Sequence, residues 1–424
     1  MMIPIRFRLV LMSFLAVFIC YIDRVNISVA IIPMQEQFGW SEAQVGIIFS
    51  IFYIGYVLTF ILGGILADKY GGKTILGVGV LLWSIFTILT PFFAYNGFLA
   101  LLFIRILIGL GEGITFPSWH SLYARWIPFN ERTRSIAITN SGISAGTIFG
   151  YIVAALIIAS YSWEWVFYSF GMLGLIWFIF WHKNFTSNPQ DHKHISSEEL
   201  KLIKSEAPAD SKATKLPLRK LLTNLPFIAI TVATFCNNWA LFTFISYLPK
   251  YVNSPISTGG LGIELESTIF IIMILIPSIV SVLALISGGY LTDSLIKKGF
   301  QVLRVRKTVN TIGFLGAAIC LSMIPFQDSH ISIIVFLCFT NAFSGIAVGG
   351  FGVNHADLGP KYTGSIVGFA GGIGMIAAII SPFVAGLILE LTGSWFLIFN
   401  ICTFVLVFGG LFYLFFADTK IQFE

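Results

Sequence analysis

The sequence predicts an all-α polytopic membrane protein with twelve transmembrane helices, and three observations support this fold class. Hydrophobic residues make up 57% of the 424 residues and charged residues only 11%, well below the roughly 25% usual in soluble domains. The mean hydropathy of +0.88 shows that polar loops do not dilute the apolar residues. The apolar residues also form stretches long enough to span a bilayer, which excludes a transmembrane β-barrel with its two-residue alternation.

Each expected helix is an apolar stretch bounded by polar or charged residues. The first stretch, which begins at Leu9, is too long for a signal peptide and lacks a small-residue cleavage site, so we expect it to be retained. Abundant glycine and phenylalanine suit helices that pack closely and face hydrocarbon. In chain order, the expected spans are 9–33, 44–66, 75–95, 98–124, 136–159, 165–183, 226–250, 268–291, 308–326, 331–353, 363–389 and 394–416.

The distribution of basic residues predicts the orientation of these helices. The chain has 25 basic and 20 acidic residues, a formal charge of +5. With a cytoplasmic N-terminus, the outward loops carry only Lys250, and Arg24 and Arg105 lie within spans. The other basic residues lie in inward connections or termini, at Arg6, Arg8, Lys69, Lys73, Arg125, Arg132, Arg134, 183–220, 297–307, Lys361 and Lys420. By the positive-inside rule both termini are cytoplasmic, and the basic charge serves membrane insertion rather than nucleic-acid binding.

A long polar segment divides the chain into two halves. We expect an N-terminal six-helix bundle at 1–183, a cytoplasmic linker at 184–225 and a C-terminal six-helix bundle at 226–424. Within the linker, Ser196 and Glu199 have the spacing of a capping box, which predicts a short surface helix.

The two halves repeat each other. The motif Gly64–Lys73 after the second span has a counterpart at Gly289–Asp293 after the eighth. In the fifth span, Gly142, Gly146 and Gly150 place one small residue per turn on one face, which permits close helix packing. Two pseudo-symmetric six-helix bundles with a site at their shared midplane are typical of a rocking transporter.

The cysteines give no sign of a disulfide or a metal site. They fall inside expected helices without paired spacing, at Cys20, Cys236, Cys320, Cys338 and Cys402. We interpret them as small packing residues and expect no metal and no cofactor.

Buried charge is the most informative feature of the sequence. Four charged residues lie deep within expected spans, namely Asp23, Arg24, Arg105 and Glu112. Charge in hydrocarbon costs about 2.5–3.5 kcal/mol on insertion scales, so these side chains should face a wet cavity or one another. Tyr21, Arg24 and Ser28 form one polar stripe, where Arg24 can hold a carboxylate or phosphate with two hydrogen bonds. Asp23 is turned about 100° away. The structural alternative is an Asp23 and Arg24 network that serves packing alone.

Arg105 and Glu112 share one face of the fourth span, because seven residues are about 20° short of two helical turns. A buried carboxylate beside an arginine is suited to bind and release a proton. A static salt bridge is the alternative. His120 lies eight residues further on, and His355 occupies the related place in the second half. Each is either a proton-handling residue or a histidine satisfied at the membrane interface.

Several motifs together resemble known families. The run G-x-x-x-D-K-x-G-x-K from Gly64 to Lys73, the Arg105 and Gly109 pair and the glycine ladder of the fifth span resemble signatures of the major facilitator superfamily. More narrowly, four segments resemble the anion:cation symporter family, which includes bacterial hexuronate and galactonate transporters, plant phosphate transporters, sialin and the vesicular glutamate transporters. These are YIDRVNISVA at 21–30, RILIGLGEGITFP at 105–117, FCNNW at 235–239 and VNHAD at 353–357.

The resemblance implies the major facilitator fold, with Arg24 as the substrate ligand, Glu112 as the coupling carboxylate and Arg105 as its partner. The other candidate residues are assigned from their positions in the sequence. Substrate binding is assigned to Arg24, Tyr21, Ser28 and Asn237. Proton coupling is assigned to Glu112, with Arg105 as its partner, and to Asp23 and His120. A cytoplasmic gate is assigned to Asp68, Lys69, Lys73 and Asp293, with ordinary positive-inside anchoring as the alternative.

The chain also departs from the family at two places. The vesicular glutamate transporters have an arginine where this chain has Asn237, so a second fixed cation for dicarboxylates is missing. The eleventh span reads Ala370-Gly371-Gly372 where a polar Ser-Asn-Thr run is common. Both differences leave the individual substrate open.

These features predict a secondary transporter, not an enzyme, that moves a small organic anion by proton-coupled symport and alternating access. A phosphate symporter is the alternative within transport. A membrane enzyme that uses His120 or His355 as a base, or a non-transporting sensor, is the alternative of another class. The short first outward loop, 34–43, and the short termini favour a bacterial inner-membrane protein, which we expect to be a monomer.

Overall fold

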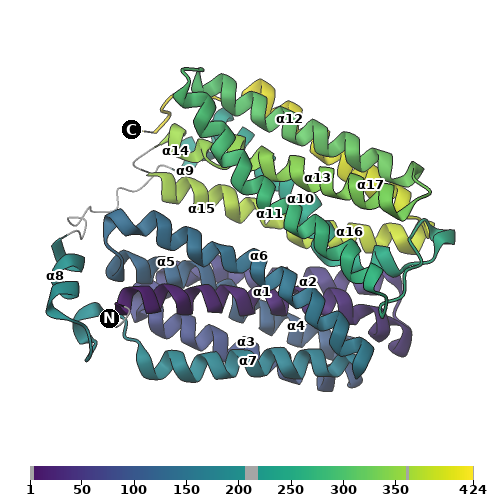
Figure 1. Ribbon diagram of the computed structural model, residues 1–424, viewed down its shortest axis with the longest axis horizontal. Coiled ribbons are helices and arrows are strands. Elements are labelled where there is room, and N and C mark those ends of the chain that lie inside the picture. Colours follow the sequence, from purple (N-terminus) through teal and green to yellow (C-terminus); the bar gives the residue numbers. More distant parts are fainter. Residues whose placement is uncertain (1–3, 206–217, 360–361, 424) are drawn as a thin grey trace. The chain divides into compact units, whose positions relative to one another are not determined.

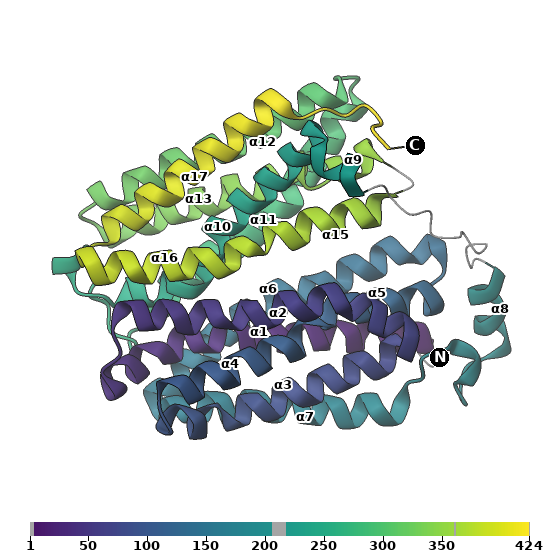
Figure 2. The ribbon, with the colours of Figure 1, turned by 180° about the vertical axis from the view of Figure 1, so that it is seen from behind.

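The structure, a computed structural model, describes residues 4–205, 218–359 and 362–423. Within these ranges the chain forms helices and no strand, and twelve helices are long and apolar enough to cross a membrane (Figures 1 and 2). The predicted all-α fold with twelve spans is therefore confirmed. The helices are α1 Ile5–Phe38, α2 Glu42–Tyr70, α3 Gly72–Tyr95, α4 Phe98–Gly113, α5 Thr115–Trp126, α6 Phe129–Ser160, α7 Trp163–Asn184, α8 Ser197–Ser205, α9 Leu218–Thr223, α10 Leu225–Asn253, α11 Thr268–Lys297, α12 Val302–Met323, α13 His330–Phe351, α14 Asn354–Leu358, α15 Thr363–Gly374, α16 Ile376–Thr392 and α17 Trp395–Phe416.

Two of the expected spans are interrupted rather than continuous, and a short helix follows the end of a third. α14 follows the expected end of the tenth span at residue 353. The fourth span breaks at Ile114 into α4 and α5, and the eleventh breaks at Met375 into α15 and α16. At the last break, the Asn238 side-chain amide of α10 donates to the Gly374 carbonyl at 3.1 Å. A side chain thus satisfies a carbonyl beside the interruption, where hydrocarbon offers no donor.

The first and seventh spans extend beyond their expected ends. α1 continues to Phe38, so the first outward connection is shorter than expected, and α10 continues to Asn253. Lys250 therefore lies within a helix, where it forms an ion pair with Glu42 and is only 7% exposed. Its assignment to an outward loop was wrong, because hydropathy alone does not reveal a lysine whose charge is paired.

The helices form two compact units. Met1–Gln37 and Ile51–Thr214 make up the first, and Phe38–Ser50 and Lys215–Glu424 make up the second. The division into bundles at 1–183 and 226–424 with a linker between them remains a prediction. Within that expected linker, Lys212 and Lys215 lie outside the described residues, as does Lys361 elsewhere in the chain.

Close helix contacts hold the first unit together. α3 packs against α4 and α7, which lie beside it in both ribbon views (Figures 1 and 2). The glycine ladder of α6 faces α1, where a Cβ added at Gly142 would lie 2.7 Å from the Phe14 carbonyl oxygen. A Cβ added at Gly150 would lie 2.6 Å from the Val25 side chain. The predicted close packing of the glycine face is confirmed.

The predicted surface helix is also present, as α8. The Ser196 hydroxyl accepts the Glu199 backbone N–H at 3.1 Å, which is half of the predicted capping box. The Glu199 carboxylate does not return to Ser196. It accepts the Arg6 backbone N–H at 2.9 Å and the Ile5 backbone N–H at 3.2 Å, so it joins α8 to the beginning of α1.

In the second unit, α13 packs against α11 and α12, and α17 packs against α10 and α12. A polar network ties the end of α13 to its neighbours. The Arg306 guanidinium of α12 binds Asp357 at 3.0 Å and the Gly349 carbonyl at 3.1 Å. The Asn354 amide donates to the Tyr413 hydroxyl of α17 at 2.8 Å. These bonds supply partners for polar groups where α13 ends and α14 begins.

Candidate functional site

The buried charges predicted from the sequence lie in the first unit. Arg24 is 4% exposed, Arg105 2%, Asp23 1% and Glu112 0%. α1 supplies Asp23 and Arg24, and α4 supplies Arg105 and Glu112. We call these four residues the charged cluster. It holds two cations and two carboxylates, a balance that makes its burial possible because isolated charges would be too costly to desolvate.

An ion pair between α1 and α4 is the central contact of the charged cluster. The Arg24 Nη2 atom lies 3.1 Å from Glu112 Oε2, and both side chains are buried. The Cys20 thiol donates to the same oxygen at 3.2 Å, one helical turn before Arg24. Cys20 therefore takes part in a polar contact, and our interpretation of it as a packing residue was incomplete. The sequence placed Arg105 beside Glu112 and did not suggest that Arg24 binds this carboxylate.

Aromatic rings surround the two arginines. The Arg24 guanidinium carbon lies 4.4 Å from the ring centroid of Tyr21 and 4.7 Å from that of Tyr56. The Arg105 guanidinium carbon lies 4.8 Å from the centroid of Phe52 on α2. Such faces attract a cation through their quadrupole and exclude water from it. The rings carry no formal charge, so they cannot neutralise the positive charge of the arginines. Carboxylates therefore form the strongest interactions available to these two guanidinium groups.

The predicted polar stripe is only partly realised. Tyr21 and Arg24 lie together, as expected. The Ser28 hydroxyl instead donates to the Val25 carbonyl of its own helix at 2.7 Å. Asp23 points to another neighbour, because its Oδ2 atom accepts the Thr87 hydroxyl of α3 at 3.5 Å. Asp23 and Arg24 therefore contact different helices, as the helical spacing predicted.

The charged cluster retains unused hydrogen-bonding capacity. Three buried atoms have no hydrogen-bond partner among the described residues: Glu112 Oε1, Asp23 Oδ1 and Arg24 Nε. Buried polar atoms in proteins are nearly always satisfied, so a group of three in one place is unusual. Two acceptors and one donor are available for a proton, a water or a ligand.

Neither histidine contacts the charged cluster through a hydrogen bond among the described residues. His120 of α5 is exposed and stacks on Trp119, with ring centroids 3.7 Å apart. His355 of α14 has its Nδ1 atom 3.1 Å from the Gly352 carbonyl oxygen.

The gate candidates occupy the ends of helices in each unit. In the first unit, the Asp68 carboxylate accepts the Ser121 hydroxyl at 2.7 Å, and Lys69 lies 5.1 Å from the ring centroid of Tyr70. Lys73 Nζ donates to the His182 carbonyl at 3.4 Å. In the second unit, Asp293 is exposed near the end of α11. The contacts within the first unit are local, and the gate role stays a prediction.

Asn237 of α10 is half-buried in the second unit, and its neighbour Asn238 makes the contact with Gly374. The sequence analysis included Asn238 in the FCNNW motif but gave it no role, although two adjacent amides in an apolar span are a visible signal. It also missed Tyr56 and Phe52 around the arginines, since aromatic residues are common in membrane spans and carry no distinguishing pattern.

Comparisons with known proteins identify the family of this chain. The sequence model of the Major Facilitator Superfamily matches residues 13–379. The ascorbate transporter of Arabidopsis thaliana chloroplasts is 35% identical over 98% of this chain and 75% of that protein. The chloroplast sodium-dependent phosphate transport protein 1 of the same plant is 36% identical over 94% of this chain and 76% of that protein.

A solved structure shows the same fold. It is a bacterial homologue of the human lysosomal transporter Spinster in an inward-facing, unoccupied conformation, with a TM-score of 0.79 and 16% identity over 98% of this chain and 97% of that chain. The resemblance seen in the sequence motifs is thus confirmed by the family match, the anion-transporter relatives and the fold. The chain is a multi-pass membrane transporter protein that belongs to the major facilitator superfamily.

Proposed function

We propose that this protein is a secondary active transporter that moves a small organic anion together with a proton by alternating access. The observation that carries the proposal is the buried ion pair between Arg24 and Glu112 at 3.1 Å. Arg24 is the natural ligand for an anion, and here it is occupied by a carboxylate that can be neutralised by a proton.

The pairing gives a physical reason for coupling. While Glu112 is ionised, its carboxylate competes with any anion for the Arg24 guanidinium. Protonation of Glu112 removes the competing charge, so a substrate carboxylate can take its place on Arg24. Each ligand then favours binding of the other, which is the reciprocity required of linked sites. Glu112 Oε1, which has no hydrogen-bond partner among the described residues, is positioned to hold the proton.

The surroundings of Arg24 favour an organic anion. Tyr21 and Tyr56 present ring faces to its guanidinium, and such faces also suit the carbon skeleton of a sugar acid or carboxylate. A relative named as an ascorbate transporter supports this substrate class. Inorganic phosphate is the second candidate, because another relative is named as a sodium-dependent phosphate transport protein. That name also makes sodium the alternative coupling ion.

The remaining assignments belong to the same proposal. We place both termini in the cytoplasm of a bacterial inner-membrane protein that acts as a monomer and catalyses no reaction. Asn237 is a further substrate-binding residue, Asp23 and Arg105 support proton binding at Glu112, and His120 is a second proton-handling residue. Asp68, Lys69, Lys73 and Asp293 form the cytoplasmic gate.

Purified protein tests the proposal in two steps. A thermal-shift screen of sugar acids, amino acids, dicarboxylates and phosphate identifies the ligand, since a bound ligand raises the melting temperature. Uptake of that ligand into proteoliposomes is then measured with a pH gradient at equal sodium on both sides of the membrane. It is also measured with a sodium gradient at equal pH on both sides. Accumulation driven by the pH gradient is expected. Accumulation driven only by the sodium gradient would reject the proton as the coupling ion. A thermal shift with phosphate alone would reject an organic anion as the substrate.

A further inference from the structure

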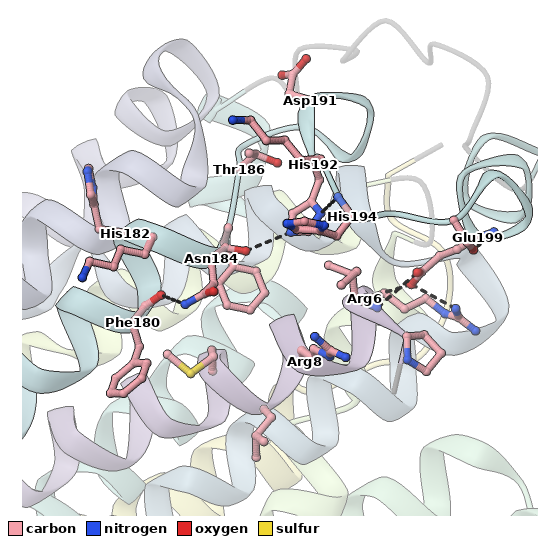
Figure 3. Close-up of a pocket in the computed structure, with 18 of the residues that line it drawn as sticks. Arg6, Arg8, Phe180, His182, Asn184, Thr186, Asp191, His192, His194 and Glu199 are labelled. Atoms are coloured by element: carbon pink, nitrogen blue, oxygen red, sulfur yellow. Dashed lines mark hydrogen bonds and ion pairs between the residues drawn. The ribbon is translucent and has the colours of Figure 1, made fainter. Parts of the chain in front are cut away.

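A groove lies at one end of the first unit, apart from the charged cluster. Its cavity has a volume of about 1030 Å³ and lies between the beginning of α1, the end of α7 and the segment that leads to α8 (Figure 3). α1 begins at Ile5 and α7 ends at Asn184, and both helices are candidate membrane spans. The groove therefore sits where two spans meet the edge of the hydrocarbon.

Hydrogen bonds fix the walls of the groove. The Trp177 indole of α7 donates to the Met12 carbonyl of α1 at 2.9 Å, which ties these two helices together. The His192 Nε2 atom lies 2.9 Å from the Asn184 carbonyl oxygen, and its Nδ1 atom accepts the His194 backbone N–H at 3.2 Å. These contacts join the segment after α7 to the end of that helix, as Figure 3 shows.

On the opposite side, Arg6 holds α8 in place. Its guanidinium lies 2.7 Å from Glu131 of α6 and 3.2 Å from Glu199 of α8. The Glu199 carboxylate also accepts backbone N–H groups at the beginning of α1. The groove is thus a built feature, bounded by α1, α7 and an anchored surface helix.

The lining combines positive charge with apolar surface. Arg8, Lys183 and Lys193 line the groove with three basic side chains in addition to Arg6, and three histidines line it as well. Among the lining residues, Asp191, Glu198 and Glu199 are the acidic ones, and Glu199 is already paired with Arg6. In Figure 3, Arg8 lies below the Arg6 and Glu199 pair.

The apolar part of the lining faces outward. Leu11 is 55% exposed on α1, and Phe180 is 59% exposed on α7, and both lie within membrane spans. Exposed leucine and phenylalanine side chains on membrane-spanning helices are suited to contact acyl chains. Basic side chains that lie directly beside them at the membrane surface match the charge of an anionic headgroup.

We propose that this groove binds one anionic phospholipid. Arg8 and Lys183 contact the headgroup phosphate, and one acyl chain lies along Leu11 and Phe180. A lipid headgroup and a soluble phosphate ester share the same phosphate chemistry. We favour a lipid because exposed apolar side chains adjoin the basic residues of the groove. This site is independent of the transport function proposed above.

The test measures lipid binding to the purified full-length protein in a neutral detergent by native mass spectrometry. The probes are dioleoyl phosphatidylglycerol, dioleoyl phosphatidylcholine, and glycerol 3-phosphate as the headgroup without chains. The groove variant is Arg8→Gln with Lys183→Gln. The matched control, Lys297→Gln with Lys298→Gln, removes two exposed basic residues at the end of α11.

Phosphatidylglycerol is expected to bind more tightly than phosphatidylcholine. The groove variant should lose about 25-fold in affinity for phosphatidylglycerol, since each basic residue near an anionic lipid contributes roughly fivefold, while the control should change little. Equal binding of the two lipids, or equal losses in both variants, overturns the proposal. So does displacement of phosphatidylglycerol by glycerol 3-phosphate at similar concentration, because the groove would then be a site for soluble phosphates. Melting temperatures in lipid-free detergent verify that all variants are folded.

Discussion

In the proposed mechanism, Arg24 is the residue on which recognition depends most directly. Its guanidinium contacts Glu112 and lies against the rings of Tyr21 and Tyr56. A planar guanidinium can keep its stacking contacts while two of its N–H groups bind a carboxylate. A lysine ammonium has neither the planar face nor the paired donors.

Replacing Arg24 with lysine should weaken substrate binding by about tenfold or more, because the charge is kept while the two-pronged geometry is lost. Binding is measured by titrating the ligand found in the thermal-shift screen. Arg134→Lys, at an exposed position on α6, is the control and should bind normally. Unchanged affinity in a folded Arg24→Lys protein would move the anion site elsewhere, with Arg105 as the next candidate.

Replacing Glu112 with glutamine should abolish uphill uptake driven by a pH gradient. Glutamine keeps the shape of a protonated carboxyl but cannot release a proton, so Arg24 stays available to the anion. Substrate binding and the exchange of internal for external substrate should survive, because exchange requires no net proton movement. Accumulation and counterflow are compared in the same proteoliposomes, with the exposed Glu264→Gln variant as the control.

Two outcomes would contradict that role of Glu112. Normal pH-driven accumulation by Glu112→Gln would show that the proton binds at another residue. A collapse of the melting temperature with loss of both activities would favour a static ion pair, since removing one partner of a buried pair costs about 3–5 kcal/mol.

The sequence could identify the charged residues of the site but not their pairing. Charge within an apolar stretch is visible in one dimension, and helical spacing correctly separated Asp23 from Arg24. The choice of partner for Glu112 depends on how α1 approaches α4, and Cys20 and Glu112 are 92 residues apart in the chain. No local pattern reports such a contact.

Among the helices, apolar length was predicted well and internal breaks were not. Hydropathy measures how readily side chains transfer from water into lipid. By that measure α4 and α5 together are as apolar as one continuous span. The break at Ile114 changes the backbone without changing that composition. The end of α1 shows the opposite case, since Gln35, Glu36 and Gln37 lower the hydropathy while the helix continues to Phe38.

The contact between α6 and α1 predicts a clear difference between two glycine substitutions. A Cβ at Gly146 would collide with the Phe18 carbonyl of α1, whereas a Cβ at Gly289 of α11 would meet no atom within 4 Å. Gly146→Ala should therefore lower the free energy of unfolding by about 1–3 kcal/mol. Gly289→Ala should leave it unchanged or slightly raised, because alanine favours the helix. Melting temperatures measured in one detergent decide the matter, and equal values would mean that α6 and α1 pack less closely.

For the whole molecule, the distribution of basic residues predicts the orientation in the membrane. In a variant without native cysteines, Ser205→Cys at the end of α8 should react with an impermeant maleimide only after the membrane is permeabilised. Ser257→Cys, between α10 and α11, should react in intact cells and serves as the control. Labelling in the reverse order would invert the whole topology.

The balance of the charged cluster bears on how voltage acts on transport. Two arginines and two carboxylates are buried in it, so the cluster carries no net formal charge when both carboxylates are ionised. If a proton on Glu112 admits a monoanion to Arg24, the loaded protein has the same net charge as the empty one. A membrane potential does work only on net charge that moves, roughly 2.3 kcal/mol per charge per 100 mV. Uptake of a monoanion should thus be electroneutral and independent of an imposed potential, whereas a divalent substrate would move one negative charge through the field with each turnover.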